Sequence, residues 1–338
     1  MKGAVFHGVG QPLTIEELED PKPGAGELVL RVKSCGICGS DLHAATLPPG
    51  LPAGTVMGHE FAGEVVEVGS GTTGWKAGDR ACAFPAIGCG KCGACLTGDV
   101  VLCTSLRGIG LGQIKGAYSE YVLVGGPESV RLPGGVSFRE GALVEPLAVG
   151  LHAVNKAGLQ PGERVMVIGA GPIGLAVTAW ARFFGARAVV VNEKAPGRIA
   201  LAQKFGATAV ADVAKEDPVT VFQRETGGPP DVVFECVGVP GLLQQCIGMT
   251  RARGRVVVVG VCMQPDTIFP VMGVVKEVNV QFVVAYHKRD FELTVDMLDR
   301  GRIPGRDMIT DVVDLAAFPS AFEALKNPTH QCKVILEP

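Results

Sequence analysis

Six short apolar runs alternate with longer amphipathic segments in the second half of the chain, and this alternation constrains the fold more than any other feature. An apolar run of five to seven residues is typical of a strand that is buried on both faces of a parallel sheet. The segments between the runs have the length of crossover helices, so the pattern predicts βαβ units and a doubly wound α/β sheet. The six expected strands are 164–168, 188–192, 208–212, 231–235, 255–259 and 280–286.

The first 150 residues follow a different pattern. Short strand-like runs at 27–34, 60–70 and 117–125 are interrupted by Gly and Pro, which predicts a mostly β domain. From about Lys288 the chain returns to mixed helix and strand, and we expect its final segment, CKVILEP, to pair back onto the β-rich first part. A chain of 338 residues is long enough for two such domains, each with its own core.

Charge and apolar content exclude several classes of protein. The 31 Lys and Arg residues nearly balance the 34 Asp and Glu residues, which argues against a nucleic-acid partner. The first residues lack the apolar core of a signal peptide, and the longest apolar run, 256–263, is too short for a bilayer. We therefore expect a cytoplasmic protein with no membrane segment. In such a protein, eleven cysteines favour metal ligation over disulfides.

The motif GAGPIG directly follows the first of the six expected strands. A bare G-x-G-x-x-G motif is weak evidence, but here a strand precedes it and a helix follows, with Pro172 near the first helical turn. These glycines would let a pyrophosphate approach the backbone amides at the helix N-terminus. The alternative is a tight turn that binds no cofactor. The candidate cofactor-binding residues are Gly169, Gly171, Pro172, Ile173 and Gly174.

An acidic residue, Glu193, stands at the end of the next expected strand. At this position a carboxylate can accept hydrogen bonds from the adenosine ribose hydroxyls, and it would repel a 2'-phosphate. The sequence therefore favours NAD over NADP. The neighbouring Lys194 and Arg198 point the other way, because either side chain could pair with a phosphate.

Four cysteines are clustered in the segment GCGKCGACLTGDVVLC. The intervening lengths of two, two and seven residues allow four thiolates to converge on one ion, and a closed tetrahedral zinc site of this kind has a structural role. Unrelated core cysteines and an iron–sulfur cluster are the alternatives, although the spacing differs from the usual cluster motifs. The expected ligands are Cys89, Cys92, Cys95 and Cys103.

A second set of possible metal ligands is divided between two motifs. Cys38 lies in SCGICGSDLH, and His59 and Glu60 lie in MGHEFAG. Three mixed ligands and an open position describe a catalytic zinc. Glu145, in LVEPLAVG, is a further carboxylate that could reach the metal directly or through water. Taken singly, Cys38 and His59 are more often ordinary buried residues than ligands.

With all these motifs in one order, the whole chain resembles the zinc-containing medium-chain dehydrogenases, which include alcohol, sorbitol, threonine and butanediol dehydrogenases. The resemblance rests on CGICGSDLH, GHEFAGEVVEVG, the four-cysteine segment, EPLAVG and GAGPIG. It implies a GroES-like catalytic domain over 1–150, completed by 288–338, and a Rossmann domain over 151–287. It also implies hydride transfer between NAD(P) and a secondary alcohol, diol or polyol, which forms a ketone or aldehyde.

The resemblance assigns roles to residues of the first domain. Cys38, His59 and Glu60 correspond to the catalytic zinc set, and Glu145 stands where alcohol-type members have a cysteine, as in the polyol and threonine branch. Which of the two glutamates binds zinc stays open. Asp41 would orient the imidazole bound to zinc, and Ser40 and His43 would form the proton relay; simple turn or surface roles are the alternatives.

The resemblance also extends to the cofactor and to assembly. Arg198 corresponds to the arginine that covers the adenosine ribose, although it could also be a solvated helix residue. Val261 and Val284 lie where relatives offer backbone groups to the nicotinamide amide. The family further suggests two zinc ions per chain and a homodimer or homotetramer, with the segment 280–286 as a plausible contact between subunits.

Two other interpretations fit parts of the sequence. One is a zinc-free quinone or enoyl reductase of the same superfamily that uses NADPH, although such relatives generally lack the Cys38, His59 and four-cysteine set. The other is a redox-sensing or nucleic-acid-binding protein in which the four cysteines form a zinc ribbon. The balanced charge and the lack of a basic stripe argue against the second.

Overall fold

The structure is a computed structural model that describes residues 1–338. The chain divides into two compact units, each of which is described by itself. The first comprises Met1–Glu145, Tyr286–Arg300 and Ile309–Pro338, and the second comprises Pro146–Ala285 and Gly301–Met308. The segment Gly301–Met308 thus belongs to the second unit, whereas the sequence analysis assigned all of 288–338 to the first.

The first unit is mostly β, as predicted. Its largest sheet has seven strands in the order β10-β6-β5-β3-β18-β17, with β9 paired to β3, and two smaller sheets have the orders β2-β1-β4 and β7-β8. The strands are β1 (Lys2–Phe6), β2 (Thr14–Glu17), β3 (Glu27–Gly36), β4 (Thr55–Val56), β5 (Glu60–Val68), β6 (Arg80–Ala83), β7 (Ala86–Ile87), β8 (Arg107–Gly108), β9 (Tyr121–Gly125), β10 (Ser129–Arg131), β17 (Ile309–Val313) and β18 (Lys333–Leu336).

The C-terminal strand β18 is inserted into the sheet of the first unit, which confirms the expected return of the chain. It pairs antiparallel with β3, so that Ile335 lies opposite Gly36, and Gly36 lies opposite Glu60 of β5 on its other side. Residues about 275 positions apart in sequence thereby meet around β3. The helices of this unit are α1 (Gly39–Thr46), α2 (Gly93–Leu96), η1 (Val100–Leu102), α3 (Phe138–Ala142), α10 (Lys288–Asp299) and α11 (Phe318–Ala324).

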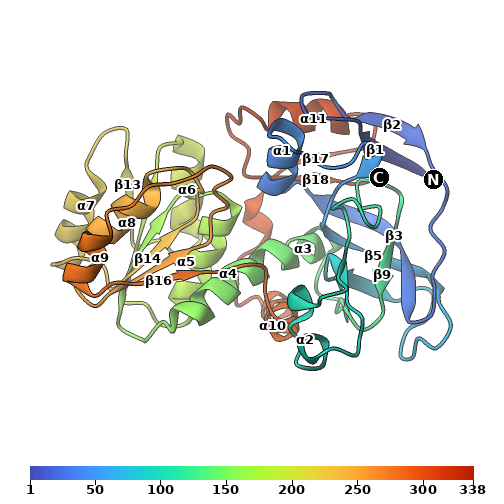
Figure 1. Ribbon diagram of the computed structural model, residues 1–338, viewed down its shortest axis with the longest axis horizontal. Helices are drawn as coiled ribbons and strands as arrows, with labels where there is room; N and C mark the ends of the chain where they lie inside the picture. The colour runs from blue at the N-terminus through green and yellow to red at the C-terminus, as the bar shows by residue number, and fades with distance from the viewer. The chain divides into compact units, whose positions relative to one another are not determined.

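The second unit contains the predicted doubly wound sheet. Its six strands are parallel and have the order β13-β12-β11-β14-β15-β16, with helices packed against them (Figure 1). The strands are β11 (Arg164–Ile168), β12 (Ala188–Glu193), β13 (Ala209–Asp212), β14 (Val232–Glu235), β15 (Arg255–Val258) and β16 (Asn279–Phe282). The helices are α4 (Val144–Ala157), which begins in the first unit, α5 (Pro172–Phe183), α6 (Pro196–Lys204), α7 (Pro218–Thr226), α8 (Leu242–Met249), α9 (Pro270–Lys276) and η2 (Arg306–Met308).

The last strand of this sheet differs from the prediction. The apolar pattern predicts a buried strand over 280–286, but β16 ends at Phe282 and all four of its residues are exposed. Ala285 has a φ of 48°, which is incompatible with a continuing strand. β16 lies at the edge of the sheet, where only β15 pairs with it, so no further strand shields its outer side.

Separate hydrophobic cores stabilise the two units. In the second, apolar residues of the central strands, such as Met166, Val190 and Val233, pack with Phe222 of α7 and Ile247 of α8. None of the helices of the chain combines the length and the apolar character needed to cross a membrane.

Candidate metal and cofactor sites

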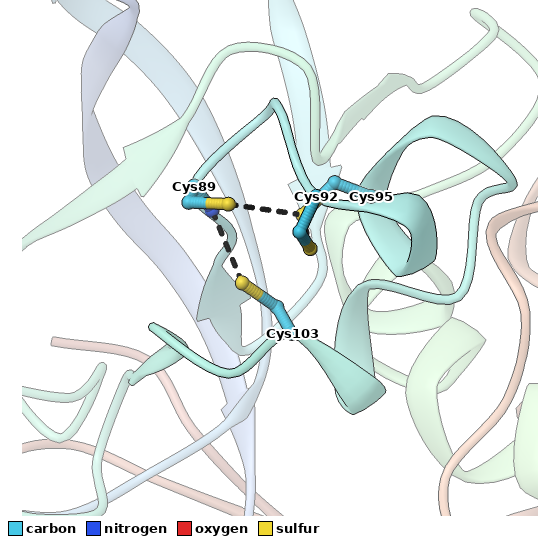
Figure 2. Close-up of side chains that lie close together, drawn as sticks. All are labelled: Cys89, Cys92, Cys95 and Cys103. Carbon is cyan, nitrogen blue, oxygen red and sulfur yellow. Dashed lines mark hydrogen bonds between the residues drawn. The ribbon is translucent and has the colours of Figure 1, made fainter.

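The four cysteines predicted to bind a structural zinc converge at one point of the first unit. Their sulfur atoms all lie within 4.8 Å of one another, and Figure 2 shows the side chains turned toward a common centre. Two loops place them: Cys92 immediately precedes α2, and Cys103 immediately follows η1. The local fold therefore gathers the ligands without long-range strand pairing.

The distances and the chemistry of these sulfurs fit one tetrahedral ion. Four sulfurs at about 2.3 Å from a zinc would be about 3.8 Å apart, and the Cys92–Cys95 and Cys89–Cys95 sulfurs are separated by 3.5 and 4.0 Å. Backbone N–H groups of Lys91 and Cys92 lower the pKa of the Cys89 thiol to about 6. Burial raises the pKa of Cys95 to about 12, so a metal would have to displace its proton.

The second set of predicted ligands is arranged around the start of α1. Cys38 occupies the N-cap of this helix, and its backbone N–H donates to Oδ2 of Asp41 over 3.1 Å. The other oxygen of Asp41, Oδ1, lies 3.3 Å from Nδ1 of His59, while Nε2 of His59 lies 3.3 Å from Oγ of Ser40. One short helix and the residue before β5 thus bring Cys38, Ser40, Asp41 and His59 together.

The electrostatic environment of His59 favours a positive charge. Burial by itself would lower the pKa of this imidazole, but the charges of Asp41 and Cys38 raise it well above its usual value. Nδ1 of His59 is buried and lacks a well-aligned hydrogen bond. A cation next to His59 and Cys38 would satisfy the same negative groups, so the residues present fit a metal ion.

Glu60 is already engaged by a residue that the sequence analysis did not identify. Nζ of Lys333 lies 2.7 and 2.6 Å from the two carboxylate oxygens of Glu60 and 2.8 Å from the carbonyl oxygen of Ile37. A Cβ at Gly36 would collide with the Glu60 carboxylate, so glycine makes room for the pair. The only sequence signal for it is a lysine at the start of the apolar segment KVIL.

Glu145 has no such basic partner. It lies in the first turn of α4, and burial raises the pKa of its carboxyl to about 7, with opposing effects from the nearby charges of His59 and Glu60. These electrostatic interactions place Glu145 in the neighbourhood of the other predicted ligands. No three of the Cys38, His59, Glu60 and Glu145 ligand atoms approach one another as closely as the sulfurs of the four-cysteine site do.

The two residues of the predicted proton relay lie one helical turn apart on α1. Ser40 is exposed, and its hydroxyl contacts His59 as described above. His43 is half-buried, and its Nδ1 atom has no hydrogen-bond partner. A contact between Ser40 and His43 is not observed, so the relay stays a prediction.

The glycine motif has the expected strand–turn–helix geometry. Gly169 follows β11 with a φ of +93°, Gly171 caps α5, and Pro172 begins that helix. A Cβ at Gly174 would collide with the carbonyl oxygen of Gly169, so this glycine allows the helix to pack close to the turn. Ile173 is the second residue of the helix and is half-buried.

Glu193 closes the turn from the neighbouring strand. Its Oε2 atom accepts a hydrogen bond from the backbone N–H of Ala170 over 3.0 Å, and Oε1 accepts from the N–H groups of Lys194 and Ala195. Oε2 retains a further acceptor site, whereas both lone pairs of Oε1 are used. The carboxylate is thus held rigidly beside the glycine turn by the backbone.

A pocket of about 540 Å³ opens beside this turn in the second unit. Its lining includes the predicted Gly169, Gly171, Glu193 and Arg198, together with Lys194. The apolar side of the pocket was not predicted, because its residues belong to no sequence motif: Pro218, Val237, Leu242 and Met249. Val261 and Val284 do not line the pocket, and both are more than half exposed.

Two family models match the chain. Residues 24–134 match the alcohol dehydrogenase GroES-like domain, and residues 172–300 match the zinc-binding dehydrogenase domain.

Curated relatives are similar over the full length. The (R,R)-butanediol dehydrogenase of Bacillus subtilis is 35% identical over 353 residues, covering 100% of this chain and 100% of the relative. The sorbitol dehydrogenase of the same organism is 31% identical over 345 residues, covering 100% and 97%.

Solved structures are similar to the same extent. The 2R,3R-butanediol dehydrogenase from Bacillus subtilis superposes with a TM-score of 0.90 at 35% identity, covering 100% of this chain and 99% of that one. A dehydrogenase structure from Sinorhizobium meliloti that is bound to NADP gives a TM-score of 0.88 at 32% identity, with the same coverage.

Proposed function

Because this chain belongs to the zinc-containing medium-chain alcohol and polyol dehydrogenases, we propose that it oxidises a secondary alcohol, diol or polyol to the carbonyl compound with NAD as hydride acceptor. The matched zinc-binding dehydrogenase domain and the butanediol and sorbitol dehydrogenase relatives support this reaction. They favour it over a zinc-free reductase and over a zinc-ribbon protein.

The observation that carries the proposal is the arrangement around His59. Asp41 lies next to Nδ1 of the imidazole, and Ser40 lies next to Nε2. The thiol of Cys38 is close enough to influence the pKa of the ring. A thiolate, an oriented imidazole and a nearby carboxylate form the donor set of a catalytic zinc with an open position.

We assign the carboxylate of this donor set to Glu145. Nζ of Lys333 contacts both carboxylate oxygens of Glu60 and neutralises its charge. Glu60 would therefore have to give up a buried ion pair in order to bind a metal. Glu145 has no competing basic partner, and the metal charge would favour its ionised form. The sequence by itself leaves the choice between Glu60 and Glu145 open.

The residues of the chain then have distinct tasks in the reaction. When bound, the zinc supplies Lewis acidity, which lowers the pKa of a substrate hydroxyl. Asp41 holds the His59 ring in one orientation. Ser40, at the exposed start of α1, would accept the hydroxyl proton on Oγ, and His43, one turn along the same helix, would be the later proton acceptor.

The preference for NAD rests on Glu193. Its backbone hydrogen bonds fix a negative charge beside the turn that would hold the pyrophosphate, where a 2'-phosphate would meet it. Arg198 and Lys194 line the same pocket, and either could pair with a phosphate. We therefore expect NAD to bind more tightly than NADP without NADP being excluded. The four-cysteine site would bind a second, structural zinc with no open position.

We also propose that the enzyme is a homo-oligomer. Strand β16 has a free edge, and large apolar side chains on β16, on α9 and at the N-cap of α9 are exposed to solvent: Phe269, Val271, Val274, Val275 and Phe282. Exposed apolar surface of this kind is typical of subunit contacts. A cytoplasmic location stays a prediction from the sequence.

A substrate screen in zinc-replete buffer tests the function. We expect reduction of NAD, measured at 340 nm, with vicinal diols or polyols, and weaker reduction of NADP. Removal of zinc with a chelator should abolish the activity, and added zinc should restore it. Full activity after removal of both zinc ions, or reduction of enones by NADPH in place of alcohol oxidation, would contradict the proposal.

A further inference from the structure

Tyr118 makes an unusually close contact with the residue that supports the predicted zinc ligand. Its hydroxyl donates a hydrogen bond of 2.5 Å to Oδ2 of Asp41, and both side chains are buried. The other oxygen of Asp41 faces Nδ1 of His59 at 3.3 Å. A continuous chain of polar contacts therefore runs from Tyr118 through Asp41 to His59.

We propose that Tyr118 is a positioning residue for the catalytic metal, because its hydroxyl fixes the carboxylate that orients the His59 imidazole. The inference rests on the proposed zinc site. A carboxylate that accepts one backbone N–H, that of Cys38, can still rotate about its terminal bond. A second strong hydrogen bond on the same oxygen defines where the free oxygen, Oδ1, points.

The tyrosine also contacts the backbone segment that leads into His59. Its N–H donates to the carbonyl oxygen of Met57 over 3.0 Å. Gly58, which directly precedes His59, has a φ of +97°, and a Cβ at that position would lie 2.5 Å from the Tyr118 ring. Tyr118 thus contacts both the Asp41 carboxylate and the backbone shortly before His59.

The ring itself is held by aromatic neighbours on α11. The centroid of Phe318 lies 4.6 Å from that of Tyr118, and the centroid of Phe322 lies 6.3 Å away. A phenylalanine at position 118 would keep these contacts and the fold, since it differs from tyrosine only by the hydroxyl. The hydroxyl is therefore the part of the side chain that serves the metal site.

The experiment measures zinc release from the holoenzyme with a chromogenic chelator. Cys38→Ser first identifies the release phase that belongs to the catalytic site, because that phase should disappear. Tyr118→Phe should accelerate the same phase about tenfold, in the range typical of lost outer-sphere support, and should leave the four-cysteine phase unchanged. Tyr121→Phe, in which the lost hydroxyl contacts only Arg31 at the surface, is the matched control and should release zinc like the wild type.

A double-mutant cycle separates positioning from general loosening of the fold. If Tyr118 acts through Asp41, adding Tyr118→Phe to Asp41→Asn should change the release rate by less than twofold. Equal release rates for Tyr118→Phe and the wild type would overturn the inference and leave the proposed function intact. A wild-type enzyme without a release phase that depends on Cys38 would overturn both. Should Tyr118→Phe prove unstable, the Asp41→Asn variant still tests the chain: unchanged release in Asp41→Asn would also overturn the inference.

Discussion

Lys333 and Glu60 form an ion pair in which both side chains are only 1% exposed, with Nζ 2.6 Å from Oε2. The two residues stand on β18 and at the start of β5, and β3 separates their strands. The pair links the C-terminal strand of the chain to the segment that carries His59.

Replacing Lys333 by methionine should destabilise the protein by about 3–5 kcal/mol, because it leaves an uncompensated carboxylate in the core. Urea unfolding in zinc-replete buffer measures the change. The double variant Lys333→Met/Glu60→Gln should recover part of the loss, since it removes the buried charge. Lys215→Met, which breaks an exposed pair with Asp212, is the control and should cost less than about 1 kcal/mol. A similar cost for the two lysines would contradict the structural role of the buried pair.

The four-cysteine site predicts one structural zinc ion per chain, and this number can be measured. Cys103→Ala should reduce the zinc content by one ion per chain and lower the melting temperature, because the ion supplies folding energy to this loop. Metal analysis by mass spectrometry and a thermal scan are the measurements. Cys262→Ala, at an exposed thiol outside the site, should retain all the zinc. Iron and acid-labile sulfide in the wild-type protein would show instead that the cysteines hold a cluster.

Glu193 should control the choice of dinucleotide. Glu193→Gln removes the charge and keeps one of the two acceptor oxygens that the backbone N–H groups use, so binding of NADP relative to NAD should improve about tenfold. Dissociation constants from the fluorescence of the reduced cofactors report the ratio. Arg198→Gln is expected to shift the ratio in the opposite direction, because the pocket loses a partner for phosphate. An unchanged ratio in Glu193→Gln would mean that the carboxylate has only its structural role in the turn.

Asp231 should contribute to the stability of the second unit in a pH-dependent way. Despite its partial burial, hydrogen bonds from Arg164 and Arg251 hold the pKa of this carboxyl well below its usual value. A lowered folded-state pKa means that the stabilisation is present above the unfolded pKa of about 3.9 and is lost as the pH falls below it.

The expected result for Asp231→Asn is a loss of about 2 kcal/mol at pH 7 that shrinks as the pH is lowered below about 4. Denaturant unfolding at several pH values gives the profile. Asp307→Asn, at an exposed pair with Lys204, should change the stability little at any pH. A cost for Asp231→Asn that stays constant with pH would argue against ionic stabilisation.

Local sequence patterns determined most of the architecture. Each of the six parallel strands is formed by neighbouring residues, and the same holds for the glycine turn at 169–174 and the four-cysteine site. Spacing and periodicity were therefore sufficient to predict them. The pattern failed at 283–286, because apolar composition alone does not distinguish a buried strand from the exposed edge of a sheet.

Only the tertiary structure determined which residues that are distant in sequence contact one another. Lys333 meets Glu60, and Tyr118 meets Asp41, because the pairing of β18, β3 and β5 and the packing of the loops bring together segments up to 273 residues apart. Hydrogen bonds and ion pairs depend on distances of a few tenths of an ångström, which no spacing along the chain specifies. The sequence therefore named the candidate ligands, whereas the fold determined that one of them, Glu60, is paired with Lys333.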